Sequence, residues 1–292
     1  MPGQIVREDG LQIVLMIMFV SKPDTKAVQM TRTLSRGLAP VVERLELERP
    51  RLVTLRDIEA ICSDEGLGTE PRVVASRLKK AGWLLSTGRR GAWEFAPAEL
   101  AGPYSSCDPL LPVKALSAVN SNSSPLLRGQ TAAWALGLAD RVPSTVEVVL
   151  PEKARGAIPA SVSACVYQTN LEPVRAKGAL SLAPEAIIVQ MADRPSSVRS
   201  WEGAAEWLPD VMSEAVAGAI LDELKGKSVA TGQRVGYLMQ GVRADIADEV
   251  LKVVRPKSVA WFGRGKAKRT NGKWKVADAK LPWDPEKMEM MV

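Results

Sequence analysis

The 292-residue chain contains no histidine and only three cysteines, Cys62, Cys107 and Cys165, which stand far apart. Without histidine, Ser-His-Asp and Cys-His catalysis are excluded, and no set of Cys and His ligands has the spacing of a zinc site. The cysteines also lack the dense pattern of a small secreted domain, so we expect them to be reduced, buried or inert. The sequence therefore predicts no metal site.

Phosphate-binding glycine motifs are absent as well. Neither GxxxxGK[ST] nor GxGxxG occurs, and no Gly-Ser dipeptide is followed by the spaced aspartates of a nucleotidyltransferase. Carboxylates are present, but none is paired with a base, a phosphate loop or a metal-ligand spacing. We therefore expect a protein without catalytic residues or a cofactor, which is not an enzyme.

Long hydrophobic runs are scarce. The apolar stretch at 11–20 is too short to span a bilayer, and it follows Glu8 and Asp9 where a secretory signal has basic residues. These features predict a cytoplasmic protein with no membrane partner. Residues 1–30 are expected to be an N-terminal extension, either a strand or disordered, and translation starting at Met30 is the alternative.

With 46% hydrophobic residues, the chain is long enough for two domains with buried cores. Its net charge of +6 is modest, but the positive charge is concentrated in two segments without any acid, at 71–93 and 255–277. An ordinary solvated surface alternates acidic and basic residues. This distribution indicates an anionic partner.

The first acid-free segment lies in a predicted winged helix-turn-helix at 31–100. Apolar residues at three- and four-residue steps predict helices at 30–49, 55–65 and from an N-cap at Thr69 to Ala81. Short strands at 83–87 and 92–96 follow, joined by a Gly-Arg-Arg-Gly turn. Three helices followed by a two-stranded wing are typical of domains whose third helix enters the major groove of DNA.

The residues expected to contact DNA share an outward position on the third helix or at the tip of the wing. They are Arg72, Ser76, Arg77, Lys79, Lys80, Arg89 and Arg90. Arg72 and Ser76, near the start of the helix, are the candidates for reading bases, because arginine can chelate guanine in the major groove. The lysines and the two wing arginines are better suited to phosphates, and Arg77 lies closer to the edge of the core.

The rest of the chain, 101–292, predicts a larger mixed α/β domain, which makes the fold class α+β. Helices are expected at 126–138, 184–191, 201–208, 211–224 and 233–240. Strands are expected at 146–150, 162–166, 258–262 and 273–277.

A possible second basic surface, in a C-terminal hairpin, comprises Arg264, Lys266, Lys268, Arg269 and Lys273. Trp261, Phe262 and Trp274 are interleaved with it and suit either a stacking platform for nucleic acid or a set of aromatics turned into the core.

Several strings in chain order resemble the AbiEi family of type IV antitoxins, across most of residues 30–281. The wing pattern is carried by Arg77, Leu78, Gly82, Trp83, Leu84, Gly91, Trp93, Phe95 and Pro97. A second pattern, which opens the C-terminal domain of that family, is carried by Thr131, Ala132, Ala133, Trp134, Leu136, Gly137, Leu138, Asp140, Arg141, Pro143, Val146, Val148 and Pro151. The N-terminal extension and the lysine-rich tail depart from the family.

The resemblance implies a transcriptional autorepressor that binds inverted repeats in double-stranded promoter DNA, together with an antitoxin activity in the C-terminal domain. It further implies a nucleotidyltransferase-like toxin that is opposed without a stable complex. An inverted repeat would place two copies on DNA, whether the protein is a monomer or a dimer in solution. The alternative is a winged-helix protein-interaction module attached to an uncharacterised enzyme domain.

Overall fold

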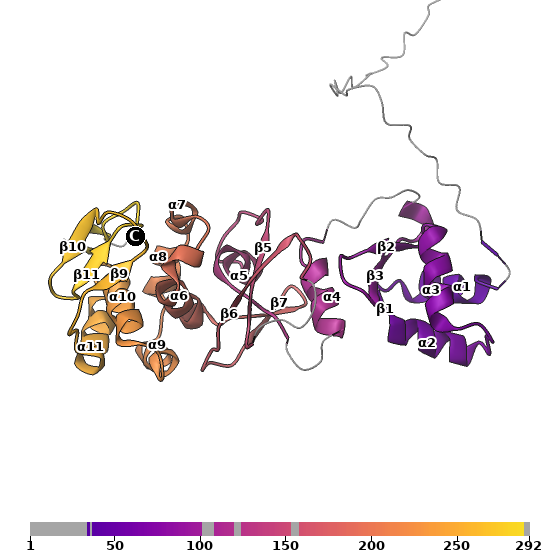
Figure 1. Cartoon of the computed structure of the whole chain (residues 1–292), viewed down its shortest axis with the longest axis horizontal. Helices are drawn as coiled ribbons and strands as arrows, with labels where there is room; N and C mark the ends of the chain where they lie inside the picture. The colour runs from indigo at the N-terminus through magenta and orange to yellow at the C-terminus, as the bar shows by residue number, and fades with distance from the viewer. Residues whose placement is uncertain (1–33, 36, 101–107, 120–123, 153–157, 289–292) are drawn as a thin grey trace, which may run out of the picture.

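The computed structural model describes residues 34–35, 37–100, 108–119, 124–152 and 158–288. The molecule is elongated, with the N-terminal helices at one end, a five-stranded sheet in the middle and a small C-terminal sheet at the other end (Figure 1). The predicted N-terminal extension and Cys107 lie outside the described residues. Cys62 is buried and Cys165 is partly buried, and burial raises the pKa of both thiols.

The N-terminal part begins with α1 (Ala39–Glu48), which is shorter than the predicted helix at 30–49. A proline at the second helical position fits only the first turn of a helix, and Pro40 accordingly lies at the start of α1. Residues 30–33 are not described, whereas Leu34 lies outside the helix and is exposed. The expected helix start was therefore wrong.

The next two helices are α2 (Leu55–Asp64) and α3 (Pro71–Lys80). Thr54 caps α2 in a reciprocal capping box, in which its hydroxyl accepts from the Asp57 amide and the Asp57 carboxylate accepts from the Thr54 amide. The N-cap of α3 is Glu70 rather than Thr69, because Pro71 occupies the first helical position.

A three-stranded antiparallel sheet completes this part, with β1 (Leu52–Thr54), β2 (Leu84–Ser86) and β3 (Ala92–Phe95) in the order β1-β3-β2. The strands β2 and β3 form the expected hairpin, whereas β1 was not predicted. The helices and the sheet enclose their own hydrophobic core, which includes Val41, Leu45, Ile58, Val74, Leu78, Leu84 and Phe95. This order of elements is compatible with the predicted winged helix-turn-helix, and we keep the name winged helix for this part of the chain.

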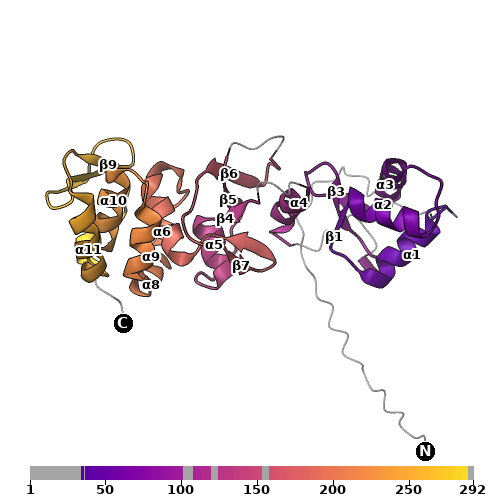
Figure 2. The ribbon, with the colours of Figure 1, turned by 90° about the horizontal axis from the view of Figure 1, so that it is seen from below.

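The helix α4 (Leu111–Val119) packs against β1 and β3 and so lies between the winged helix and the central sheet (Figures 1 and 2). Asp108 precedes it and accepts from the Leu110 amide and from Lys114, at 2.7 Å. Arg51 of the winged helix lies 4.0 Å from the same carboxylate. The wing also lies close to the loop just before β6, because a Cβ atom built on Gly88 would lie 3.0 Å from Cβ of Pro159.

The central sheet has the order β6-β5-β4-β8-β7. Its strands are β4 (Leu126–Leu127), β5 (Val146–Leu150), β6 (Val162–Val166), β7 (Val174–Ala176) and β8 (Ala179–Ser181). The pairs β5–β6 and β4–β8 are parallel. Between β4 and β5 runs α5 (Gly129–Leu136), so the first residues of the helix predicted at 126–138 are instead a strand.

Helices then cover the region between the two C-terminal sheets. They are α6 (Pro184–Asp193), α7 (Trp201–Ala204), α8 (Leu208–Ser213), α9 (Ala217–Leu224), α10 (Val229–Met239) and α11 (Ala244–Val254). The segment predicted as two helices, at 201–208 and 211–224, forms three. Pro209 lies in the first turn of α8, and a proline there cannot continue a preceding helix.

The last sheet comprises β9 (Ala260–Phe262), β10 (Arg269–Asn271) and β11 (Val276–Asp278), in the order β10-β11-β9. It packs on α10 and shares the large core of the C-terminal part through Phe262, Trp274 and Val276. The predicted α+β fold class is confirmed.

Candidate nucleic-acid interface

The helix α3 divides cleanly between a buried and an exposed face. Val74, Ala75 and Leu78 are buried in the winged-helix core, whereas Arg72, Ser76, Arg77, Lys79 and Lys80 are all exposed. The first turn of α3 contains no acid, so that apart from Val73 the exposed residues of the helix itself are basic or carry a hydroxyl group. The helical spacing therefore positions the predicted residues as expected.

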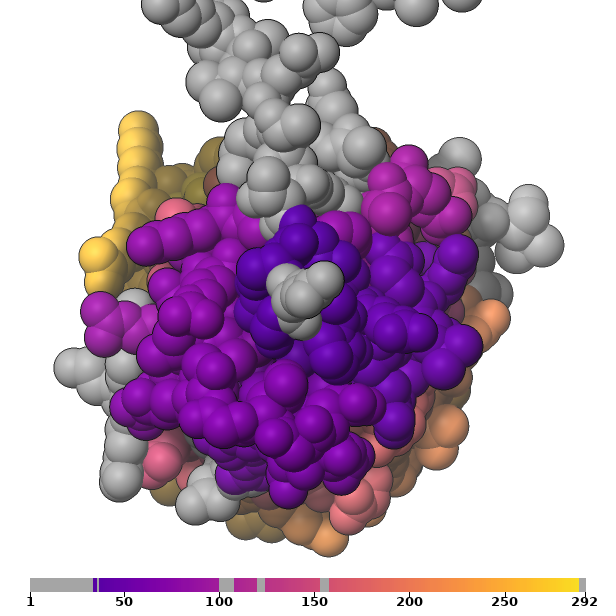
Figure 3. Space-filling model, turned by 90° about the vertical axis from the view of Figure 1, so that its right-hand side faces the viewer, coloured from indigo at the N-terminus to yellow at the C-terminus, as the bar shows by residue number. Residues whose placement is uncertain are grey.

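The wing turns at two glycines with positive φ, 79° at Gly88 and 81° at Gly91, a conformation that favours glycine. Between them, the Arg89 amide donates to the Thr87 hydroxyl, and this hydroxyl donates to the Ala92 carbonyl at 2.9 Å. The turn that carries Arg89 and Arg90 is thus held by its own hydrogen bonds. The winged helix forms one end of the molecule, which Figure 3 shows in indigo and purple with C-terminal atoms behind it.

A groove of about 350 Å³ separates α3 from the wing. Five of the seven predicted residues line it: Arg72, Ser76, Lys79, Arg89 and Arg90. Ser86, Gly88, Gly91 and Trp93 contribute from the wing side. Helix and wing therefore present a single concave cationic surface.

Arg77 and Lys80 lie elsewhere. They line a second hollow, of about 530 Å³, together with Leu34, Ser35 and Leu38 from the start of the described chain. This hollow lies where α3 meets the approach to α1. The structure therefore divides the predicted contact residues into a groove set of five and a separate pair.

Three cations of the groove have no ion-pair partner among the described residues. Residues 71–93 contain no acid, and within the described part of the chain no ion pair involves Arg72, Lys79 or Arg90. Glu94, the first acid after the wing, is buried at 3% exposure. Such a surface attracts a polyanion, and its concave shape suits a phosphate backbone and the adjacent groove of a duplex.

The second basic surface is less uniform than the sequence suggested. Arg269 is held by Asp278 at 2.8 Å and by the Leu281 carbonyl, so its charge is compensated inside the fold. Lys273 pairs with Asp248 at 2.9 Å. Arg264, Lys266 and Lys268 are exposed, in the connection between β9 and β10, and no ion pair among the described residues involves them.

The three aromatic residues of this segment are also divided between the core and the surface. Phe262 and Trp274 have no exposed surface and pack in the core, whereas Trp261 is 49% exposed. Two of the three thus match the core alternative rather than a stacking platform. The segment also lies far from α3, at the opposite end of the molecule (Figure 1).

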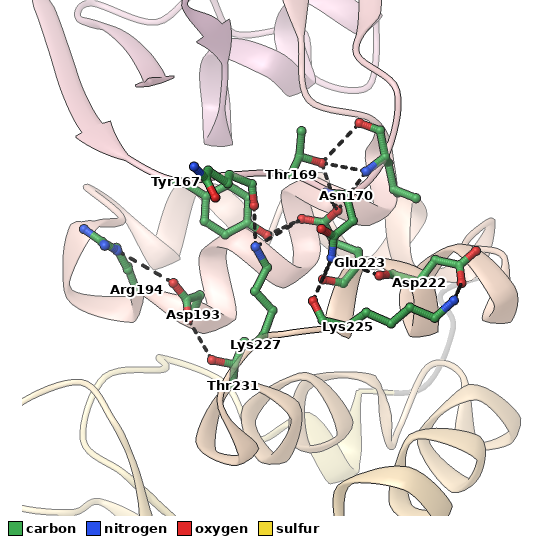
Figure 4. Close-up of polar contacts among 12 residues, drawn as sticks. Tyr167, Thr169, Asn170, Asp193, Arg194, Asp222, Glu223, Lys225, Lys227 and Thr231 are labelled. Carbon is green, nitrogen blue, oxygen red and sulfur yellow. Dashed lines mark hydrogen bonds and ion pairs between the residues drawn. The ribbon is translucent and has the colours of Figure 1, made fainter. Parts of the chain in front are cut away.

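A buried polar cluster that the sequence did not indicate joins the central sheet to the helices (Figure 4). The fully buried carboxylate of Glu223 on α9 accepts from the hydroxyls of Tyr167 and Thr169 and from the amides of Asn170 and Leu171. The Lys227 ammonium lies 4.0 Å from that carboxylate and 4.1 Å from the centre of the Tyr167 ring. Burial, followed by the bond to Glu223, raises the pKa of Tyr167 well above its usual range.

This cluster is a structural joint rather than a catalytic site. Glu223 has no exposed surface, and four donors of the same chain already surround it. The side-chain amide of Asn170 donates to the carbonyls of Asp222, Glu223 and Lys225 and so closes the end of α9. The connection after β6 is thereby fastened to the helical part.

Within the described residues, no three His, Cys, Asp or Glu side chains gather in a way that could hold a metal ion. Among the described helices, none combines the length and the apolar character that crossing a membrane requires.

Sequence reasoning missed two contributors to the groove, Ser86 and Trp93. Both lie on the wing strands, directly opposite one another in the β2–β3 pair. The alternation of side chains along a strand, applied from the turn outwards, would have placed them on the same face.

A family model matches one part of the chain, whereas a solved structure resembles most of it. Residues 125–241 match the model of the AbiEi antitoxin C-terminal domain. The crystal structure of the RV2827C protein from Mycobacterium tuberculosis is similar with a TM-score of 0.72, over 87% of this chain and 95% of that chain, at 24% sequence identity. That likeness concerns the fold alone. No curated protein matches the sequence.

Proposed function

The chain carries an AbiEi antitoxin C-terminal domain, and from this premise we propose that it is the antitoxin and DNA-binding autorepressor of a type IV toxin-antitoxin pair. In this proposal the C-terminal domain opposes a nucleotidyltransferase-like toxin without a stable complex. The winged helix binds inverted repeats in the promoter of its own operon, with two copies on the DNA.

The groove between α3 and the wing is the observation that carries the DNA-binding half. It brings together Arg72, Ser76, Lys79, Arg89 and Arg90, which the sequence separates by up to 18 positions (90 − 72). In this proposal Arg72 and Ser76 read base edges, whereas Lys79, Arg89 and Arg90 neutralise phosphates. The position of Arg77 and Lys80 beside α1 supports a peripheral role for them.

A mobility-shift assay with the full chain and the DNA upstream of its gene tests this half. We expect salt-sensitive binding that Arg72→Ala together with Lys79→Ala weakens at least tenfold. Arg77→Ala together with Lys80→Ala is the matched control, because it removes the same charges from the same helix outside the groove. Equal losses in the two variants, or no shift at low salt, would contradict the proposal.

The antitoxin half is tested by co-expression with the nucleotidyltransferase-like gene next to it. We expect the chain to restore growth, and we expect the Arg72→Ala, Lys79→Ala variant to do so equally well when both proteins are made from an unrelated promoter. A variant that represses poorly but still neutralises the toxin supports a division of labour between the domains. Failure of the unmodified chain to restore growth would refute the antitoxin role.

A further inference from the structure

A pocket of about 480 Å³ lies in the C-terminal domain, between the start of α5, the strand β5 and the connection from α6 to α7. These elements are neighbours in the middle of the molecule (Figure 1). The volume is within the range of roughly 300–1,000 Å³ that is usual for small-molecule sites. None of its lining residues belongs to the DNA groove described above.

The floor of the pocket contains a buried acid, Glu147, with 4% of its surface exposed. Its Oε1 atom lies 3.3 Å from Nη2 of Arg128, yet within the described structure it receives no hydrogen bond. Burial raises the pKa of the Glu147 carboxyl, against the opposing effects of Arg128, Arg199 and the Gln130 amide. An acceptor buried in this way is costly unless a donor reaches it.

The backbone around this acid is shaped to hold the carboxylate at the first turn of α5. Gly129 has a φ of +51°, and a Cβ atom there would lie 3.1 Å from Oε2 of Glu147. The hydroxyl of Thr131 accepts from the Glu147 amide at 2.9 Å. The carboxylate is thus held against α5 and Arg128, and Oε1 itself has almost no exposed surface. An occupant of the pocket meets the Glu147 side chain where it lines the floor.

The rim of the pocket is cationic. Arg141 and Arg199 are both exposed and line it, and the described part of the chain supplies neither with an ion pair. The exposed hydroxyls of Ser144 and Ser200 lie at the same rim. With Arg128 behind the floor, three guanidinium groups surround a single carboxylate, so the pocket favours an anion.

The walls are largely preformed. Trp207 donates from Nε1 to Oε1 of Gln130 at 2.6 Å, and Gln130 donates in turn to the Arg141 carbonyl at 3.4 Å. Val142, Val198 and Met191 supply apolar surface between the floor and the rim. An occupant therefore meets an acceptor at one end, cations at the other and an apolar middle.

We propose that this pocket binds a small organic anion of the nucleoside 5′-monophosphate class. Its phosphate lies between Arg141 and Arg199, the flat apolar faces of its base lie against the aliphatic walls, and an N–H of the base donates to the Glu147 carboxylate where this side chain lines the floor. The size of the pocket, its net positive charge and its single buried acceptor all match such a ligand. This site is independent of DNA binding.

Isothermal titration of the full chain tests the proposal, with adenosine and guanosine 5′-monophosphate as probes. The corresponding nucleosides and inorganic phosphate serve as half-ligands. We expect at least one monophosphate to bind at least tenfold more tightly than either of its halves. Arg199→Ala should weaken this binding at least tenfold, whereas Arg175→Ala, which removes an exposed arginine on β7, should leave it unchanged.

The Glu147→Gln variant distinguishes a direct contact between Glu147 and the ligand from a purely structural ion pair between Glu147 and Arg128. We expect it to weaken the monophosphate at least fivefold without changing the weak binding of inorganic phosphate. Should this variant not fold, Arg141→Ala replaces it, with an expected loss for monophosphate and phosphate alike. The proposal is overturned by an absence of monophosphate binding at millimolar concentration, or by binding that Arg199→Ala does not affect.

Discussion

The hydroxyl of Tyr167, at the end of β6, donates a hydrogen bond to the buried carboxylate of Glu223 on α9. This bond and its neighbours fasten the central sheet of the C-terminal domain to its helices (Figure 4). Four donors converge on one carboxylate that has no exposed surface, so the joint depends on a side chain that can accept all four hydrogen bonds.

Replacement of this acceptor should therefore be costly. We expect Glu223→Gln to lower the free energy of unfolding by about 2–4 kcal/mol, because the amide group turns one acceptor into a donor that faces other donors. Tyr167→Phe removes a single donor and should cost about 1–2 kcal/mol. Urea unfolding monitored by circular dichroism measures both.

Asp222→Asn is the control for this joint. Asp222 is adjacent to Glu223, but its carboxylate is exposed and pairs only with Lys225 within the described residues. We expect a change within about 0.5 kcal/mol. A loss at Asp222 as large as that at Glu223 would contradict the assignment of the joint to the buried carboxylate.

The position of the groove predicts different effects on DNA binding for two adjacent lysines. Lys79 lines the groove between α3 and the wing, whereas Lys80 lines the hollow beside α1. Each phosphate contact contributes about 0.9 to the slope of log K against log salt concentration. We expect Lys79→Ala to reduce the slope by about 0.9 and Lys80→Ala to leave it nearly unchanged, in fluorescence anisotropy titrations with promoter DNA.

The second basic surface contributes to DNA binding only if the duplex runs along the molecule. The strand β9 and the helix α3 lie at opposite ends of the molecule, and both face the upper edge of Figure 2. We propose that Arg264, Lys266 and Lys268 contact the backbone of a duplex in this orientation. Their joint replacement by alanine should reduce the salt slope by up to about 2.7 without altering discrimination between operator and random DNA.

A short operator duplex is the control for this orientation. On DNA that covers only the winged helix, the triple variant and the unmodified chain should bind with equal slopes. An unchanged slope on long DNA would show that the connection between β9 and β10 does not contact the duplex.

Glycine packing in α10 provides a further test of the C-terminal core. A Cβ atom on Gly236 would lie 2.0 Å from the ring of Trp274, which has no exposed surface. We expect Gly236→Ala to destabilise the fold by about 1–3 kcal/mol through overpacking. Gly218→Ala in α9 meets nothing within 4 Å and should raise the thermal midpoint slightly, because alanine favours a helix over glycine by about 0.5–1 kcal/mol.

The sequence was most informative where short-range rules decide the structure. The Thr54 cap, the start of α3 at Pro71 and the glycines of the wing follow from local chemistry, and the structure has each helix or turn at or next to its expected position. The strand β1 was missed because three residues carry too little periodicity, and only its pairing with β3 reveals it.

Sites that depend on long-range contacts could not be found in this way. Arg269 has the same appearance in the sequence as Lys268, and only the fold shows that Asp278 neutralises it. Glu147 and Arg128 are separated by 19 positions (147 − 128), and no spacing rule predicts that they meet beneath a pocket. Lys79 and Lys80 are neighbours whose surroundings differ because one helical step turns them to different sides of α3.

The contact between Gly88 and Pro159 has a mechanical consequence. Pro159 accepts from the Val162 amide, and Ser161 accepts from Val146, so the loop against which the wing rests is anchored at the start of both β5 and β6. The wing therefore rests against a loop that the first backbone hydrogen bonds of two strands hold in place, and this loop limits how far the wing can turn toward the central sheet.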